Sequence, residues 1–120
     1  MNENLTTRLA AVNAQISRTA QAAGRDLRSI KLVAVSKTHS ADSVRRAIAA
    51  GARIFGENKV QEAEDKIAEV GDSNAEWHLI GHLQSNKARK AVGLFDVIHS
   101  LDSTELAVRL ERICEEDGRA

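Results

Sequence analysis

The chain of 120 residues contains no proline and no tyrosine, and its only aromatic residues are two phenylalanines and one tryptophan. A hydrophobic core with this composition must come mainly from Ala, Val, Leu and Ile. No linker or low-complexity segment divides the sequence, and its length suits one domain. We therefore predict a single folded unit.

Excess charge, paired cysteines and long apolar runs are missing as well. Lys plus Arg and Asp plus Glu both number 17, so the net charge is zero, which argues against nucleic acid or an anionic membrane as the main partner. The one cysteine cannot form an internal disulfide, which fits a reducing compartment. No segment has the apolar length of a membrane span or the character of a signal peptide. These features predict a cytoplasmic protein.

Apolar strands alternate with amphipathic helices along the chain. After a leading helix over residues 4–23, four strand–helix units are predicted, with strands at 30–38, 53–56, 76–81 and 95–99. Strict alternation of this kind implies a parallel sheet with right-handed crossovers. Two architectures satisfy it: an open doubly wound sheet and part of a closed eight-stranded barrel. No Gly-x-Gly-x-x-Gly turn follows the first strand, which disfavours a dinucleotide-binding domain.

The first predicted strand, over residues 30–38, carries Lys37 where its apolar run stops. Side chains alternate faces along a strand, so Lys37 is expected to share a face with Val33 and Val35. An amine at the mouth of an apolar layer is partly desolvated, and desolvation favours the neutral form that can react with an aldehyde. The alternative is an ordinary lysine that ends a strand by reaching into water.

The carboxyl ends of all four strands are expected at one rim, which is where parallel α/β proteins bind ligands. Asn58 is a candidate to hold a ligand oxygen, with helix capping as the equal alternative. Glu57 is a candidate acid or base, although a solvated strand-end carboxylate is the simpler expectation. His82 and His99 lack the paired spacing of metal ligands, so no metal site is predicted. His78, within a strand, is expected to be packed or hydrogen-bonded there.

Three segments carry a resemblance to a known family. They are AVSKT at 34–38, FGENKVQE at 55–62 and WHLIGHLQSNK at 77–87, in matching order and spacing. Together they resemble the pyridoxal 5′-phosphate homeostasis protein family, which is related to the N-terminal barrel of alanine racemase. Lys59 and His82 stand where a tyrosine and a proline are frequent in that family.

The resemblance implies a (β/α)8-type, or TIM, barrel in which a lysine at the end of the first strand forms a Schiff base with pyridoxal phosphate. Lys37 matches that lysine, and Asn58, Ile80 and Gly81 match positions beside the cofactor. Members of the family are regarded as non-catalytic carriers in vitamin B6 homeostasis. No catalytic residue is therefore assigned, and the candidate partners are the cofactor and apo-enzymes that depend on it.

The length implies only half of such a barrel, because a closed one typically needs about 250 residues. We expect residues 1–120 to form a leading helix and four βα units of the barrel, with no second domain. In the family, the second half holds the cofactor's phosphate, so weakened binding is expected. Four strands also leave two free edges, which favour self-association.

Two other functions stay open at this stage. A racemase-like enzyme would need a second acid/base group across the cofactor ring, and no residue is a clear candidate for it. A half-barrel interaction module would pair through its free sheet edges and would have lost the cofactor.

Overall fold

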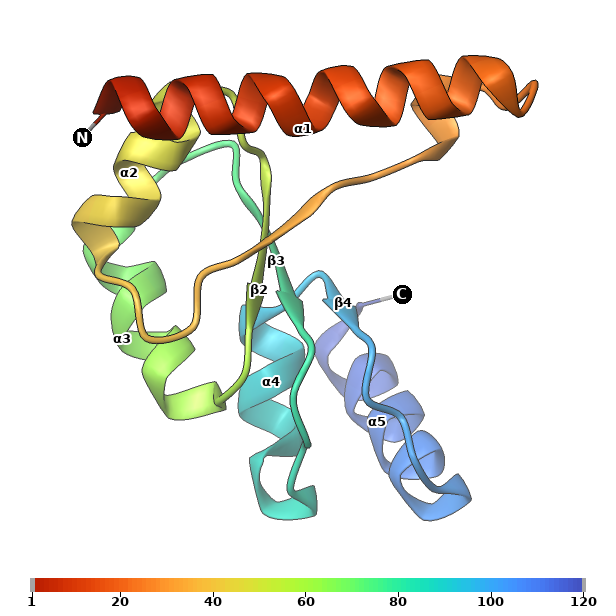
Figure 1. Cartoon of the computed structure of the whole chain (residues 1–120). Helices are drawn as coiled ribbons and strands as arrows, with labels where there is room; N and C mark the ends of the chain where they lie inside the picture. Colours follow the sequence, from red (N-terminus) through yellow and green to blue (C-terminus); the bar gives the residue numbers. More distant parts are fainter. Residues whose placement is uncertain (1, 120) are drawn as a thin grey trace.

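The computed structural model describes residues 2–119, which form five α-helices around one four-stranded sheet (Figure 1). The helices are α1 (Asn2–Ala22), α2 (Ala41–Ala49), α3 (Val60–Val70), α4 (Ala88–Leu94) and α5 (Thr104–Asp117). The strands are β1 (Val33–Val35), β2 (Ile54–Glu57), β3 (Glu76–Leu79) and β4 (Val97–Ile98). Two short 3-10 turns, η1 (Leu27–Ser29) and η2 (Ser85–Lys87), precede β1 and α4.

The sheet is parallel throughout, and its order follows the sequence, β1-β2-β3-β4. Each crossover contains one of the helices α2, α3 and α4. A doubly wound sheet requires a reversal of strand order and helices on both faces. Consecutive order is the arrangement of a (β/α) barrel, so the prediction of a parallel α/β fold with barrel-type units is confirmed.

The helices from α2 to α5 form a row along one face of the sheet, where α2 contacts α3, α3 contacts α4 and α4 contacts α5 (Figure 1). The opposite face, here called the open face, carries the alternate side chains of the strands: Val33, Val35, Ile54, Gly56, His78 and Val97. Val35 and Val97 are 50% and 42% exposed on it. Helix α1 runs along the top of the view in Figure 1 and packs against α2.

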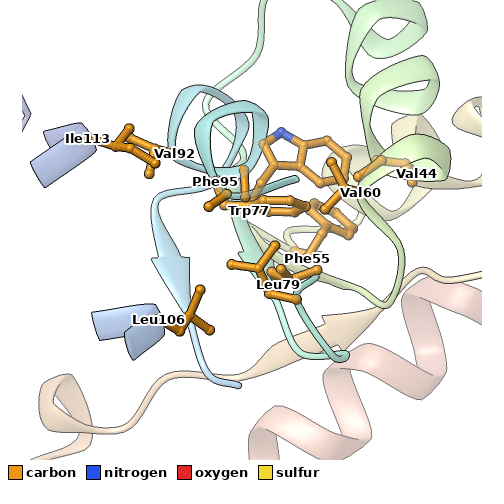
Figure 2. Packing of buried hydrophobic residues seen from close by; sticks show 14 residues of the cluster. Val44, Phe55, Val60, Trp77, Leu79, Val92, Phe95, Leu106 and Ile113 are labelled. Atoms are coloured by element: carbon orange, nitrogen blue, oxygen red, sulfur yellow. The ribbon is translucent and has the colours of Figure 1, made fainter. Parts of the chain in front are cut away.

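The hydrophobic core lies between the strands and this row of helices. Figure 2 shows Phe55 and Trp77 at its centre, with their ring centroids 5.4 Å apart. Leu79 packs beside them, and Ile113 of α5 is also a buried member of the cluster. The other buried members are mostly Ala, Val and Leu, as the shortage of aromatic residues predicted.

Helix caps agree with the sequence pattern at some helix ends and differ from it at others. Ser40 caps α2 through the Ser43 amide, and Gly118 ends α5 with a left-handed φ of 70°. Asn58 does not cap α3, which starts after Lys59 without a side-chain cap. The sequence pattern also predicts Asp102 as the cap of the last helix and Gly93 as the end of the helix before it. In the structure Ser103 caps α5, and Gly93 lies inside α4.

The two differences at helix starts share one cause. Several polar residues stand near each helix start, and any of them can accept the first free amide, so spacing alone does not select the cap. The strands are also shorter than their apolar runs, and β1 covers only three residues of the predicted nine. Among the described helices, none combines the length and the hydropathy of a membrane span.

Candidate functional site

Four predicted rim positions follow the strands directly and lie at the same edge of the sheet. Asn58 follows β2, Ile80 follows β3 and His99 follows β4, each by one residue, while Lys37 follows β1 by two. Backbone pairing reaches slightly past the strand ends, because Ile80 donates to the Glu57 carbonyl and His99 donates to the Leu79 carbonyl, both at 2.9 Å. The structure thus brings the sequence-predicted residues to one rim.

Lys37 lies in a turn and its side chain is exposed. The expected apolar surroundings are not present, because β1 ends at Val35 and Val35 is itself half-exposed on the open face. The expectation of a desolvated amine is therefore wrong for the described residues. The amine is instead accessible from the rim.

Gly81 and Asn58 are in direct contact across the rim. A Cβ built on Gly81 would overlap the backbone and side-chain oxygens of Asn58 and lie 2.8 Å from its Cγ. Only glycine permits so close an approach of two backbones. Ile80, the residue before Gly81, packs against Gly56 of β2, because its Cδ1 would lie 3.2 Å from a Cβ there. Asn58 and Gly81 therefore form a packed pair at the rim.

A surface cavity of about 350 Å³ lies on the outer side of Asn58. Its other lining residues are Lys59, Val60, Gln61, His82, Gln84 and Lys87. Among the described residues, Lys37 and Gly81 do not line it, so this cavity and the amine occupy different parts of the rim.

The side chain of Glu57 is fully buried. The expectation of a solvated carboxylate at this strand end is therefore wrong. Glu57 points to the helix-covered face together with Phe55, where Lys66 of α3 donates to its Oε2 at 2.8 Å. The Ser36 hydroxyl donates to the same oxygen. A buried carboxylate needs such a partner, since an isolated ion in the interior is strongly disfavoured.

Lys66 extends this ion pair to the Lys37 turn, residues 36–39. Its Nζ donates to the Ser36 carbonyl at 2.6 Å and to Glu62 Oε2 at 3.3 Å. Glu62 Oε2 in turn accepts the Thr38 amide at 2.6 Å. The Thr38 amide, and secondarily Lys66, hold the pKa of Glu62 below its usual value. We call Ser36, Glu57, Glu62 and Lys66 the Lys66 network.

A second polar group, the histidine chain of Glu76, His78 and His99, belongs to the open face. His78 Nε2 lies 2.6 Å from Glu76 Oε2, and its Nδ1 lies 2.9 Å from His99 Nε2. An ionised carboxylate only accepts, so His78 donates to Glu76 through Nε2, and the two histidine rings share one further hydrogen bond between His78 Nδ1 and His99 Nε2. The bond from His78 lowers the pKa of Glu76. His78 is hydrogen-bonded inside its strand, as predicted.

The remaining candidates are placed outside these groups. His82 is exposed, and its Nδ1 lies 3.5 Å from Asp102 Oδ2. Cys114 is partly buried against the core, as expected for a small apolar residue. Within residues 2–119, no group of three potential metal ligands comes together.

Sequence reasoning did not find Glu62 and Lys66. The signal was present, because the two residues have the i,i+4 spacing of a helical ion pair. Lys66 also falls three residues after Ala63, on the apolar stripe of α3. A lysine on an apolar stripe, in the helix that follows a strand ending in glutamate, indicates a buried pair.

Comparison with known families agrees with this geometry. The sequence profile of the alanine racemase N-terminal domain matches residues 7–120. The chain belongs to that family. The pyridoxal phosphate homeostasis protein of Pseudomonas aeruginosa is 51% identical over 102 residues, and the match covers 85% of this chain and 44% of that protein. The Escherichia coli protein of the same name is 49% identical over 105 residues, covering 85% and 45%.

Solved structures show the same fold. PipY of Synechococcus elongatus with pyridoxal phosphate bound is 55% identical, with a TM-score of 0.75 over 87% of this chain and 50% of its own. A protein of unknown function from Bifidobacterium adolescentis is 33% identical, with a TM-score of 0.83 over 98% of this chain and 52% of its own. The chain thus spans about half the length of the relatives it matches.

Proposed function

We propose that this chain is a pyridoxal-phosphate-binding protein of vitamin B6 homeostasis, with Lys37 as the attachment point. One observation carries the proposal: the exposed amine of Lys37 stands at the same carboxyl-end rim as Ile80 and the packed pair of Asn58 and Gly81. The names of the relatives and the pyridoxal phosphate bound to PipY support the same cofactor.

The residues of the rim fit the reactive end of this cofactor. When bound, pyridoxal phosphate supplies an aldehyde carbon, to which a neutral lysine amine attaches with loss of one water molecule. Lys37 provides that amine in an accessible turn. The absence of a Cβ at Gly81 leaves space for Asn58 to approach closely, and the Asn58 side-chain amide offers both donors and an acceptor at the rim.

We propose further that residues 1–120 are the N-terminal half of a barrel and bind the cofactor weakly on their own. In the resembling family, phosphate-binding groups lie in the second half. The loss of two charge-assisted hydrogen bonds costs about 3 kcal/mol, or about a hundredfold in affinity. Titration beside the Pseudomonas aeruginosa relative tests this, and equal affinities would contradict the phosphate argument.

The test of the attachment point compares Lys37→Ala with Lys31→Ala, since Lys31 is also exposed and belongs to the same segment. The absorbance band of lysine-bound pyridoxal phosphate is expected for the parent chain and for Lys31→Ala, and is expected to vanish for Lys37→Ala. An unchanged band in Lys37→Ala would overturn the assignment.

The proposed role is that of a non-catalytic carrier, which passes the cofactor to apo-enzymes in the cytoplasm. The homeostasis names of the relatives support it. The family's relation to alanine racemase makes racemisation the second candidate. Incubation with L-alanine and pyridoxal phosphate, followed by a chiral assay, separates the two, because a carrier leaves the L-isomer unchanged.

The sheet edges suggest a further partner, a second copy of the chain. Among the described strands, β1 and β4 each pair on one side only, and exposed edges template further pairing. Mass measurement by size exclusion, with and without the cofactor, tests self-association. A monomer under both conditions would contradict it.

A further inference from the structure

The turn that carries Lys37 has an unfavourable backbone conformation. Thr38 has a φ of 65° and is the one non-glycine residue with positive φ among the described residues. A β-branched residue is strongly disfavoured in this left-handed region, because its Cβ crowds the neighbouring carbonyl. Such a conformation persists only where surrounding contacts enforce it.

Contacts from α3 enforce it on both sides of Lys37. On the N-terminal side, Lys66 Nζ donates to the Ser36 carbonyl at 2.6 Å. On the C-terminal side, the Thr38 amide donates to Glu62 Oε2 at 2.6 Å. Both bonds involve an ionised group, and charge-assisted hydrogen bonds are about twice as strong as neutral ones. The exposed Lys37 therefore lies in a turn that contacts from α3 hold in place.

Glu62 is itself held in place by buried charge. Its Oε2 lies 3.3 Å from Lys66 Nζ, which lies 2.8 Å from Oε2 of the fully buried Glu57. Because Glu57 cannot move toward solvent, Lys66 is fixed, and Lys66 orients Glu62 toward the turn. The side chain of Glu62 is one-third exposed, so it links the buried ion pair to the surface.

We propose that Glu62 is a positioning residue for Lys37. Glu62 acts through its hydrogen bond with the Thr38 amide, and Lys66 and Glu57 hold Glu62 in place. The role of the amine rests on the proposed function, whereas the constraint on the turn does not. A fixed turn loses less conformational freedom when its amine captures an aldehyde, so capture is faster and tighter than from a mobile loop.

The first experiment measures amide hydrogen exchange over residues 36–39 without any cofactor. Glu62→Ala removes the acceptor and is expected to raise exchange there about tenfold, as for a lost charge-assisted bond. Glu62→Gln keeps an acceptor oxygen and should recover most of the protection. The control is Glu64→Ala in the same helix, because Glu64 pairs with Lys90 and does not contact the turn. It is expected to leave the exchange unchanged.

Protection that stays the same in Glu62→Ala would overturn the proposal, and so would a uniform rise in exchange across the whole chain. The second variant, Thr38→Gly, is expected to fold normally because glycine adopts this φ without strain. It removes the strain and keeps both contacts from α3, so exchange over residues 36–39 is expected to stay close to that of the parent chain. Exchange in Thr38→Gly as fast as in Glu62→Ala would count against the constraint by α3.

The second experiment measures the initial rate at which pyridoxal phosphate with sodium borohydride labels Lys37. Glu62→Ala is expected to label about tenfold more slowly than the parent chain and than Glu64→Ala. Equal rates would overturn the positioning role. Faster exchange in Glu62→Ala, together with no Lys37 labelling in the parent chain, would leave the constraint standing and overturn the proposed function.

Discussion

The Lys66 network and the histidine chain both connect the interior of the sheet to its rim, but they lie on opposite faces. In the first, Glu57 is fully buried and Lys66 is 5% exposed, with α3 covering both. In the second, His78 is buried while the side chain of Glu76 is 36% exposed and His99 is exposed. The Glu57–Lys66 pair is enclosed by protein, whereas Glu76 in the histidine chain, like Glu62 at the edge of the Lys66 network, keeps contact with solvent.

The difference determines what each group contributes. A charge without access to water depends wholly on its protein partners, so removal of one partner leaves a large uncompensated cost. A charge that reaches solvent can exchange a lost partner for water, so its bonds contribute little net stability. We infer that the buried Glu57–Lys66 pair fixes the structure of the rim, whereas the histidine chain contributes less to its stability.

Lys66→Met has the largest expected effect. It keeps the approximate volume but leaves Glu57 buried and unpaired, so the free energy of unfolding should fall by about 3–5 kcal/mol. Urea denaturation measures the loss. Lys90→Met, which breaks the exposed pair with Glu64, is the matched control and should cost at most about 0.5 kcal/mol. Equal losses in the two variants would contradict the contrast between enclosed and exposed charge.

The double variant Glu57→Leu with Lys66→Met should recover much of that loss. Replacement of a whole buried pair by apolar groups is often neutral. Moreover, Glu57 Oε1 is buried and has no hydrogen-bond partner among the described residues. Denaturation of the double variant should show a smaller loss than Lys66→Met alone. A larger, additive loss would show that the hydrogen bonds to the turn dominate over the buried charge.

Glu76→Gln on the open face has a smaller expected effect. The Gln oxygen can still accept from His78 Nε2, and the site is partly solvated. The free energy of unfolding should fall by about 1 kcal/mol or less. A loss comparable to that of Lys66→Met would show that the open face is covered in solution and that the two groups do not differ as described.

Acid pH gives the smallest expected effects and touches both groups. The Thr38 amide lowers the pKa of Glu62, and His78 lowers the pKa of Glu76. Each ionised carboxylate therefore stabilises the fold at any pH above the ordinary glutamate pKa of 4.5. That stability is lost as the pH falls through the lowered folded-state pKa. Glu62→Gln and Glu76→Gln should each flatten the acid limb of a thermal-unfolding profile, and an unchanged limb would contradict the assigned bonds.

Much of the fold was predictable because it depends on periodicity. The alternation of strands and helices gave the parallel sheet, and scarce aromatic residues gave a core of small aliphatic side chains around Phe55 and Trp77. The choice between a barrel-type and a doubly wound sheet was not available from local pattern. It depends on the strand order, which is a tertiary property.

The site was predictable in its rim and not in its support. Lys37 and Gly81 lie at the ends of predicted strands and Asn58 follows another, so topology brings them to one edge. The burial of Glu57 was missed because the sequence shows a charged residue at a strand end and does not show that α3 covers it. Likewise, the exposure of Lys37 depends on β1 ending at Val35, and strand ends are the least predictable part of an element.

The most direct test of the central claim is to add pyridoxal phosphate to the chain, reduce with sodium borohydride and map the modified peptides by mass spectrometry. Modification is expected at Lys37 far in excess of that at other lysines, and it should be lost in Lys37→Ala. Label scattered over surface lysines such as Lys59 and Lys90, with Lys37 no more reactive than they are, would contradict the claim.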